Sequence, residues 1–241
     1  MALLQKKLSD TIRPIAEDIT RRWLQFCAER TSILIKDAIR RDPRTLYGHL
    51  YYDLLEGQGV EYYDLQMAYN EPHQKGRIAA DCRLEERLQK AILTHNTCVD
   101  ACIGFWEYLH HALRDIPELK DIEAWSSMVR PRLVLFTDQD RPGRERAAKH
   151  NYIVIKFLNE ISFVIDISGY QFGFEKCFYT LAEYESEVLH LERYTTFVDM
   201  RTEMERNRSW AAGAPFQAGE VEPKSMTQLR ALELEQFVSE C

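Results

Sequence analysis

The N-terminal part of the chain carries apolar side chains three or four positions apart. Over residues 1–41 this spacing predicts one long amphipathic helix. Asp10 or Thr11 is placed to cap the helix, and Pro14 fits only a first helical turn. The Asp42–Pro43 pair ends it, because the residue before a proline is disfavoured in helical conformation.

Two further helical patterns follow, over 43–56 and 76–94. The aromatic stretch between them, 60–69, is too short to assign to a helix or a strand. These patterns predict a helical N-terminal region over residues 1–94.

The remaining pattern mixes helices and strands. Asn96 or Thr97 is placed to begin a helix that runs to about Arg114. The later predicted elements are a strand over 129–137, a polar loop over 138–149, a hairpin of strands over 150–158 and 161–167, a helix over 181–205, a loop over 210–224 and a helix over 226–239. We therefore expect an α+β core over residues 95–180, with C-terminal helices over 181–241 packed on it.

Composition narrows the function classes. The chain has 241 residues, of which 45% are apolar and 29% charged, a balance typical of globular domains. The net charge of -7 argues against a general nucleic-acid binder, which needs clustered lysines and arginines. No apolar run approaches membrane-spanning length, and the first ten residues lack the pattern of a secretory signal. We expect a cytoplasmic protein that binds neither nucleic acid nor membrane.

Six cysteines lie at positions 27, 82, 98, 102, 177 and 241. Without an export signal they are expected to be reduced thiols, most of them buried as small apolar residues. Cys98 stands apart because it falls in the first turn of its predicted helix. Free backbone N–H groups and the positive helix dipole there favour a thiolate. Ala101, Phe105 and Leu109 share its helical face, which predicts close packing of this helix on a sheet.

The predicted hairpin supplies two further groups. His150 opens its first strand, and Asp166 lies near the end of the second. A histidine on one strand and a carboxylate on the antiparallel neighbour are typical of a general base with its orienting acid.

In order, these elements are the Cys98 helix, a strand over 132–137, the His150 strand and the Asp166 strand. This order resembles the papain-like and transglutaminase-like cysteine enzymes over residues 94–175. The most specific part is Val164 to Gly173, VIDISGYQFG, which looks like the acid-bearing strand and turn of several families in that group. The resemblance implies an antiparallel sheet packed on the cysteine-bearing helix.

Carried over by residue, the resemblance implies that Cys98 is the nucleophile, His150 the base and Asp166 the orienting acid. The Cys98 backbone N–H would be one oxyanion donor. The glutamine upstream of the cysteine in papain-like proteases has no counterpart, since Gln89 lies inside a predicted helix, so the second donor stays open. Asn96 is a substitute for it, and Gln171 either lines the site or is buried under the following turn.

Three alternatives stay open. An alternative interpretation of the same region is a metal site made of His95, Cys98, Cys102 and His110 or His111. The distance of ~18 Å between Cys98 and the histidine doublet argues against it. The basic stretch 130–149 is either a solvated loop or a positively charged entrance to the site that attracts an anionic substrate. For the chain as a whole, one hypothesis is a hydrolase or acyltransferase that needs no cofactor or metal and acts on a small-molecule, peptide or carrier-linked acyl substrate. The other hypothesis is a non-catalytic binding or scaffold protein.

Overall fold

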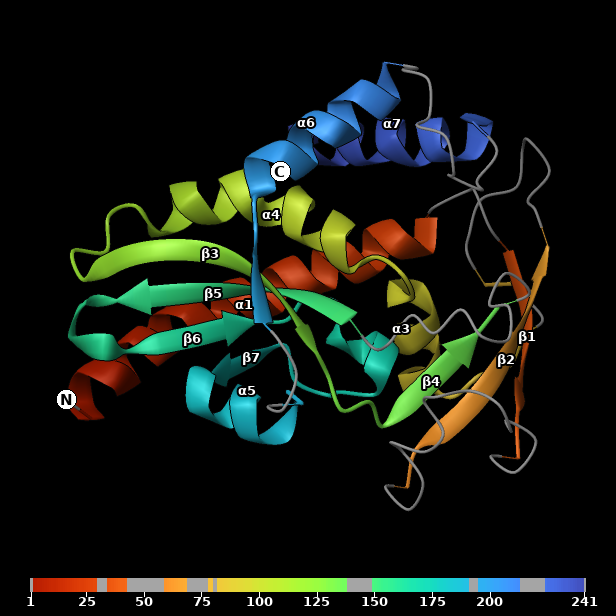
Figure 1. Cartoon of the computed structure of the whole chain (residues 1–241), viewed down its shortest axis with the longest axis horizontal. Helices are drawn as coiled ribbons and strands as arrows, with labels where there is room; N and C mark the ends of the chain where they lie inside the picture. Colours follow the sequence, from red (N-terminus) through yellow and green to blue (C-terminus); the bar gives the residue numbers. More distant parts are fainter. Residues whose placement is uncertain are drawn as a thin grey trace.

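The structure, a computed structural model, describes residues 2–29, 34–42, 59–68, 78–79, 82–137, 149–190, 195–212 and 224–240. It is a mixed α/β protein with two sheets (Figure 1). The larger sheet is antiparallel, with strand order β7-β6-β5-β3-β8. Its strands are β3 (Leu119–Met128), β5 (Lys149–Phe157), β6 (Ser162–Ile165), β7 (Phe178–Thr180) and β8 (Thr195–Val198).

The larger sheet is covered on both faces, because successive residues of a strand point to opposite sides. Ile153 and Ile155 of β5 join the main core with helices on one side, whereas Tyr152 and Val154 join a second core on the other. The helices of the main core are α1 (Ala2–Glu29), α4 (Cys98–Leu113), α6 (Met200–Ala211) and α7 (Lys224–Glu240). The second core contains α5 (Leu181–Glu187).

The smaller sheet has the order β1-β2-β4 and packs with α3 in a separate cluster. Its members are β1 (Leu34–Arg40), β2 (Glu61–Ala68), β4 (Leu133–Phe136) and α3 (Glu86–Thr94). β1 and β2 are antiparallel, and β2 and β4 are parallel. A hydrogen bond connects it to the part of the chain that follows β6. The N–H of Arg132, just before β4, donates to the carbonyl of Phe172, in the 3₁₀ turn Gly169–Phe172, at 2.8 Å.

The predicted all-helical N-terminal region is wrong in part. The helix predicted over 1–41 ends at Glu29, and residues 34–40 form strand β1. Pro14 lies inside α1 and not in its first turn, since the stripe from Leu8 to Cys27 buries seven residues and stabilises the helix on both sides of the proline. The helical spacing beyond residue 29 reflects local composition, and pairing with β2 overrides it.

Two other N-terminal predictions are resolved. The unassigned stretch 60–69 contains strand β2, and among the described residues of the helix predicted over 76–94 only those from Glu86 onward are helical. The helix predicted over 43–56 lies outside the described residues.

The middle of the chain matches the sequence better. The helix expected after Asn96–Thr97 is α4, and the hairpin of 150–158 and 161–167 is β5 and β6, connected by the 3₁₀ turn Leu158–Glu160. The strand predicted over 129–137 is shorter, as β4, and belongs to the smaller sheet.

The strand beside β5 is instead β3, which the sequence analysis missed. Its sequence, LKDIEAWSSM, has too many polar residues to suggest a buried central strand. The structure accommodates them by hydrogen bonding: Ser127 Oγ lies 2.7 Å from the Tyr152 hydroxyl and 2.8 Å from Thr195 Oγ1.

The single helix predicted over 181–205 is wrong. A capping box of Thr180 and Glu183 begins α5, which ends at Glu187. Residues 195–198 then form the edge strand β8 on β3, and Asp199 caps α6 through the N–H groups of Arg201 and Thr202. The C-terminal helix predicted over 226–239 is confirmed as α7, and the predicted loop over 210–224 lies mostly outside the described residues. The predicted division of the chain into three regions, with boundaries at residues 94 and 180, stays a prediction.

Candidate active site

Cys98 is the first residue of α4 and a free cysteine, and the residue as a whole is partly exposed although its sulfur is buried. The preceding residue, Thr97, fixes the entry to the helix: its hydroxyl donates to the carbonyl of Thr94 at 2.8 Å and accepts from the indole N–H of Trp23 at 3.3 Å. Because the first N–H groups of a helix have no helical acceptor, backbone donors remain available beside the sulfur. The predicted position of Cys98 is therefore the observed one.

His150 is the second residue of β5 and is fully buried. Its Nε2 donates to Asp166 Oδ1 at 2.7 Å. The edge of the imidazole also packs against the ring of Phe172, with 5.0 Å between the ring centroids. These contacts hold the imidazole plane and direct its other nitrogen, Nδ1, away from the carboxylate.

Asp166 follows β6 and is also buried, at 1% exposure. Its second oxygen, Oδ2, accepts a hydrogen bond of 2.9 Å from the hydroxyl of Tyr184 on α5. Gly169 makes room for this carboxylate, because a Cβ at that position would lie 2.4 Å from Oδ2. A buried carboxylate is unfavourable without hydrogen-bond partners, so Tyr184 supports Asp166 in a contact that the sequence analysis missed.

The thiol of Cys98 and the imidazole of His150 form an electrostatic pair. Burial opposes the thiolate, but the hydrogen bond and positive charge of His150 outweigh it and lower the pKa of Cys98. Burial likewise opposes the imidazolium, yet the charge and hydrogen bond of Asp166, with a smaller contribution from Cys98, raise the pKa of His150 to about 10. Each member of the pair therefore favours the charged form of the other.

Asn151 is a second contact of the thiolate that the sequence analysis missed. Its side-chain Nδ2 donates to Cys98 Sγ at 3.3 Å, and its backbone N–H also helps to lower the pKa of Cys98. An asparagine in a strand ordinarily indicates a solvated face. The available signal was its place next to His150, at the end of the strand where α4 begins.

The two candidates for the second oxyanion donor behave differently. The side chain of Asn96 is exposed and contacts His95, while its backbone N–H donates to Gln171 Oε1 at 3.0 Å. That hydrogen bond turns the amide nitrogen of Gln171 inward, 3.5 Å from His150 Nδ1. Gln171 is 5% exposed and lies in the site, whereas the Asn96 side chain does not.

Two other cysteines, Cys102 and Cys177, differ from Cys98. Burial, with the nearby negative charges, raises the pKa of Cys102 well above its ordinary value, and burial also raises that of Cys177. Within the described ranges no group of three or more histidine, cysteine or acidic side chains is placed to hold a metal ion. The rival reading of His95, Cys98, Cys102 and the histidine doublet as metal ligands therefore lacks a geometry to support it.

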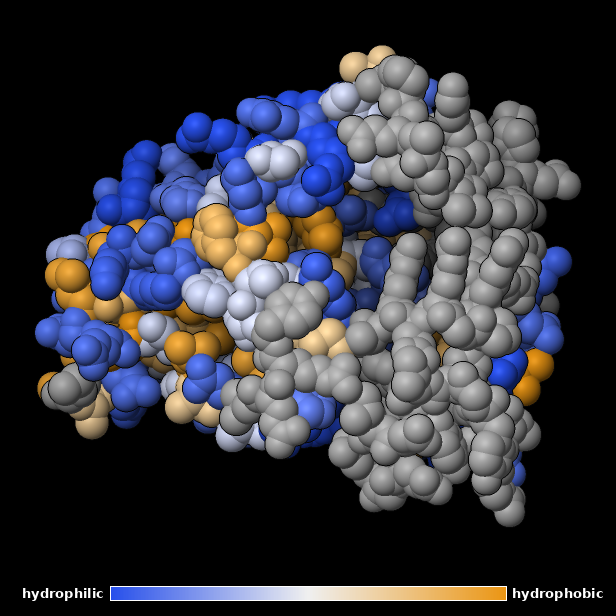
Figure 2. Space-filling model, viewed as in Figure 1, coloured by the Kyte–Doolittle hydropathy of each residue, from blue (hydrophilic) through white to orange (hydrophobic). Residues whose placement is uncertain are grey.

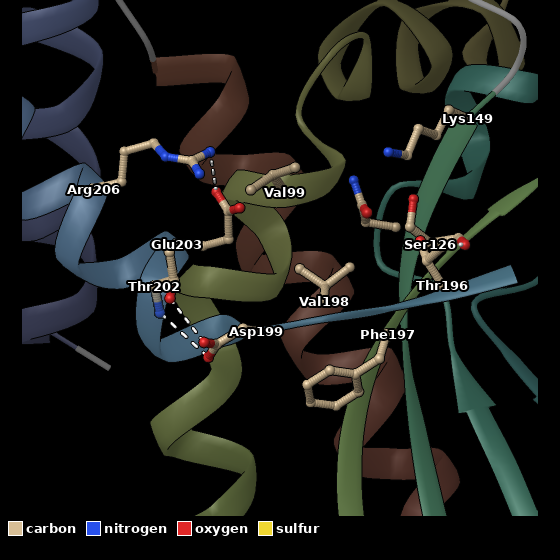
Figure 3. Close-up of a pocket in the computed structure, with 11 residues that line it drawn as sticks. Val99, Ser126, Lys149, Thr196, Phe197, Val198, Asp199, Thr202, Glu203 and Arg206 are labelled. Carbon is tan, nitrogen blue, oxygen red and sulfur yellow. Dashed lines mark hydrogen bonds and ion pairs between the residues drawn. The ribbon is translucent and has the colours of Figure 1, made fainter.

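A pocket of about 470 Å³ opens beside Cys98, lined by residues of β3, β5, β8 and the first turns of α4 and α6 (Figure 3). Two of the residues that line the pocket, Val99 and Asn151, directly follow Cys98 and His150 in the chain. Figure 2 shows hydrophobic side chains gathered over β8 and the adjoining edge of the larger sheet, where Phe197 is 61% exposed. A volume of this size suits a small ligand.

In comparisons with known proteins, no family model, no curated protein and no solved structure matches this chain. No helix in the described part of the chain has the length and apolar character needed to cross a membrane.

Proposed function

We propose that this chain is a cysteine-dependent hydrolase or acyltransferase built on a papain-like or transglutaminase-like core, in which Cys98, His150 and Asp166 act as a triad. The observation that carries the proposal is the buried hydrogen bond from His150 to Asp166, together with the effect of His150 in lowering the pKa of Cys98. Cys98 begins a helix, His150 lies on β5 and Asp166 directly follows the neighbouring strand β6, in the chain order that the resemblance implies.

The chemistry proceeds in two steps. The Cys98 thiolate attacks the carbonyl carbon of an amide, ester or thioester, forming a carbon–sulfur bond and a tetrahedral oxyanion. The bond to the leaving group then breaks as the imidazolium of His150 gives that group a proton. Water or an amine next attacks the acyl-enzyme, returns a proton to His150 and releases the thiolate as the carbon–sulfur bond breaks.

Two donors are available for the oxyanion. The backbone N–H of Cys98 lies at the start of α4, where the helix dipole is positive. The inward-turned amide nitrogen of Gln171 is the second donor, and its other end is held by the Asn96 N–H. This arrangement replaces the missing glutamine upstream of Cys98.

Intact-mass spectrometry with a panel of small ester, thioester and amide donors tests the proposal. We expect the wild-type protein to gain the mass of one acyl group on Cys98, and Cys98→Ala to gain none. Iodoacetamide at pH 6–7 should alkylate Cys98 far faster than Cys102, and His150→Ala should remove this preference.

Cys102 is the matched internal control, because it lies one helical turn beyond Cys98 but is buried with a raised pKa. Absence of any acyl adduct, together with equally slow alkylation of both thiols, would identify the chain as a non-catalytic relative that binds or scaffolds.

A further inference from the structure

The pocket beside Cys98 has two chemically different walls. Val99, Phe197 and Val198 form an apolar wall, and Lys149, Ser126 and Asn151 form a polar wall. Figure 3 shows the ammonium group of Lys149 directed into the space between β5 and α4. Since the Asn151 amide touches Cys98 Sγ, a molecule on the polar wall lies next to the nucleophile.

Lys149 supplies a positive charge at this end of the pocket. Its side chain is exposed and forms no ion pair with the described residues. The pocket's acidic groups lie toward α6 and are already engaged. Glu203 pairs with Arg206 at 3.0 Å, and Asp199 accepts from Thr202 Oγ1 at 2.8 Å while it caps α6.

Ser126 supplies an unused donor on the same wall. The residue is 2% exposed, and its hydroxyl has no hydrogen-bond partner among the described residues. The adjacent Ser127 differs, since its hydroxyl bonds both Tyr152 and Thr195. A buried hydroxyl without a hydrogen-bond partner in the protein is unfavourable, and an oxygen of a bound ligand would satisfy it.

We infer that this pocket binds a carboxylate group of the acyl substrate, so that the substrate is a short acyl compound with a carboxylate a few bonds from the reacting carbonyl. Lys149 pairs with the carboxylate, Ser126 donates a hydrogen bond to the bound molecule, and Val99 and Val198 contact its methylene groups. Lys149 and Asn151 lie two positions apart on one strand face, ~6.6 Å along the strand, which sets the spacing. This inference names the substrate class for the function proposed above and rests on it.

Binding to the Cys98→Ala protein tests the pocket without any chemistry at the thiol. In NMR titrations, glutarate should bind at least ~5-fold more tightly than its neutral analogue glutaramide, and the difference should shrink at high salt. Lys149→Gln should remove the preference. Lys120→Gln is the matched control, because Lys120 lies at the opposite end of the β3–β5 pair and its loss changes the net charge equally.

Alkylation of the wild-type protein gives a second readout. Iodoacetate and iodoacetamide both form a carbon–sulfur bond with Cys98 and release iodide, but only iodoacetate carries a carboxylate. The ratio of their rates at Cys98 should fall about 3- to 10-fold in Lys149→Gln and stay unchanged in Lys120→Gln. His150 is unchanged in all these proteins, so its charge does not affect the comparison.

The two proposals fail in different ways. If both reagents alkylate Cys98 as slowly as a buried thiol, the proposed function is wrong. If Cys98 is reactive but glutarate does not bind in preference to glutaramide, or Lys149→Gln leaves both the preference and the rate ratio unchanged, the carboxylate site is wrong. Ser126→Ala should weaken glutarate binding while leaving the iodoacetamide rate unchanged, and unchanged glutarate binding would remove Ser126 from the site.

Discussion

The imidazole of His150 donates to the carboxylate of Asp166 across 2.7 Å, and both side chains are excluded from solvent. An exposed pair of this kind contributes little, because water screens it and side-chain entropy opposes it. A buried pair is instead costly to separate, since removal of one partner leaves an unpaired charge. The pair thus fixes the ring orientation and leaves the opposite ring nitrogen, Nδ1, free of the carboxylate, 3.5 Å from the Gln171 amide nitrogen.

Gly169→Ala should displace the Asp166 carboxylate, because the new Cβ would lie 2.4 Å from Oδ2 in the present geometry. We expect a loss of ~1–3 kcal/mol in the free energy of unfolding and a slower alkylation of Cys98 at pH 6, since His150 loses its orienting partner. Urea denaturation and alkylation kinetics measure the two effects. A variant with wild-type stability and alkylation rate would show that the carboxylate moves freely.

Tyr184→Phe removes the hydroxyl that donates to Asp166 Oδ2 but keeps the packed ring. A hydrogen bond to a charged group is worth ~1.5–3 kcal/mol, so we expect a destabilisation in that range in chemical denaturation. Tyr152→Phe is the matched control. Its hydroxyl pairs with Ser127 and not with a charged group, so its removal should lower the stability by only ~1 kcal/mol. Equal effects of the two substitutions would contradict the role given to Tyr184.

Gln171→Ala should reduce kcat for acyl transfer by about 10- to 100-fold while leaving the iodoacetamide rate of Cys98 unchanged, because alkylation forms no oxyanion. Gln171→Glu separates two roles, since it keeps the acceptor for the Asn96 N–H and removes the donor. A Glu variant as active as the wild type would show that Gln171 only holds Asn96 in place.

The pH dependence of stability should follow His150. Its folded-state pKa is raised to about 10 from an ordinary 6.5, so the folded protein binds more protons than the unfolded chain between these values. The stabilisation is complete below pH ~6.5 and is lost as the pH rises through the folded-state value.

Denaturation of Cys98→Ala from pH 6 to 10 measures this loss without the opposing titration of the thiol. In that background the effect of Asp166, the largest of those that raise the pKa of His150, is retained. Addition of His150→Gln should flatten the dependence. A profile that is already flat in Cys98→Ala would show that the imidazole is neutral in the folded protein.

Local patterns in the sequence predicted much of the site. The start of α4 at Cys98 and the β5–β6 hairpin with His150 and Asp166 are short-range features, indicated by helical spacing after Thr97 and by two apolar runs joined by a tight turn. The strand expected before His150 was assigned wrongly, because β4 and β3 are distinguished only by long-range pairing. β3 was not recognised at all, since its buried serines are stabilised by partners far away in the sequence.

The supporting residues escaped prediction for a similar reason. Tyr184 lies 18 positions from the carboxylate it binds, and Asn151 lies 53 from Cys98. Neither separation along the chain corresponds to a helix or strand period, and a tyrosine in a helix or an asparagine in a strand is ordinary. The sequence likewise showed no sign that strand β8 interrupts the helix predicted over residues 181–205, because β8 is stabilised only by pairing with β3.

Three consecutive residues at the start of β5 carry separate tasks: Lys149 faces the pocket, His150 contacts the carboxylate, and Asn151 donates to the thiolate. Their alignment depends on the pairing of His150 with Ser127 of β3. A shift of one position would turn every one of these side chains to the wrong face of the sheet. Such a misaligned chain would keep much of its secondary structure, so circular dichroism would not detect it. The reactivity of Cys98 would therefore serve as a reporter of correct strand register during refolding or redesign of this protein.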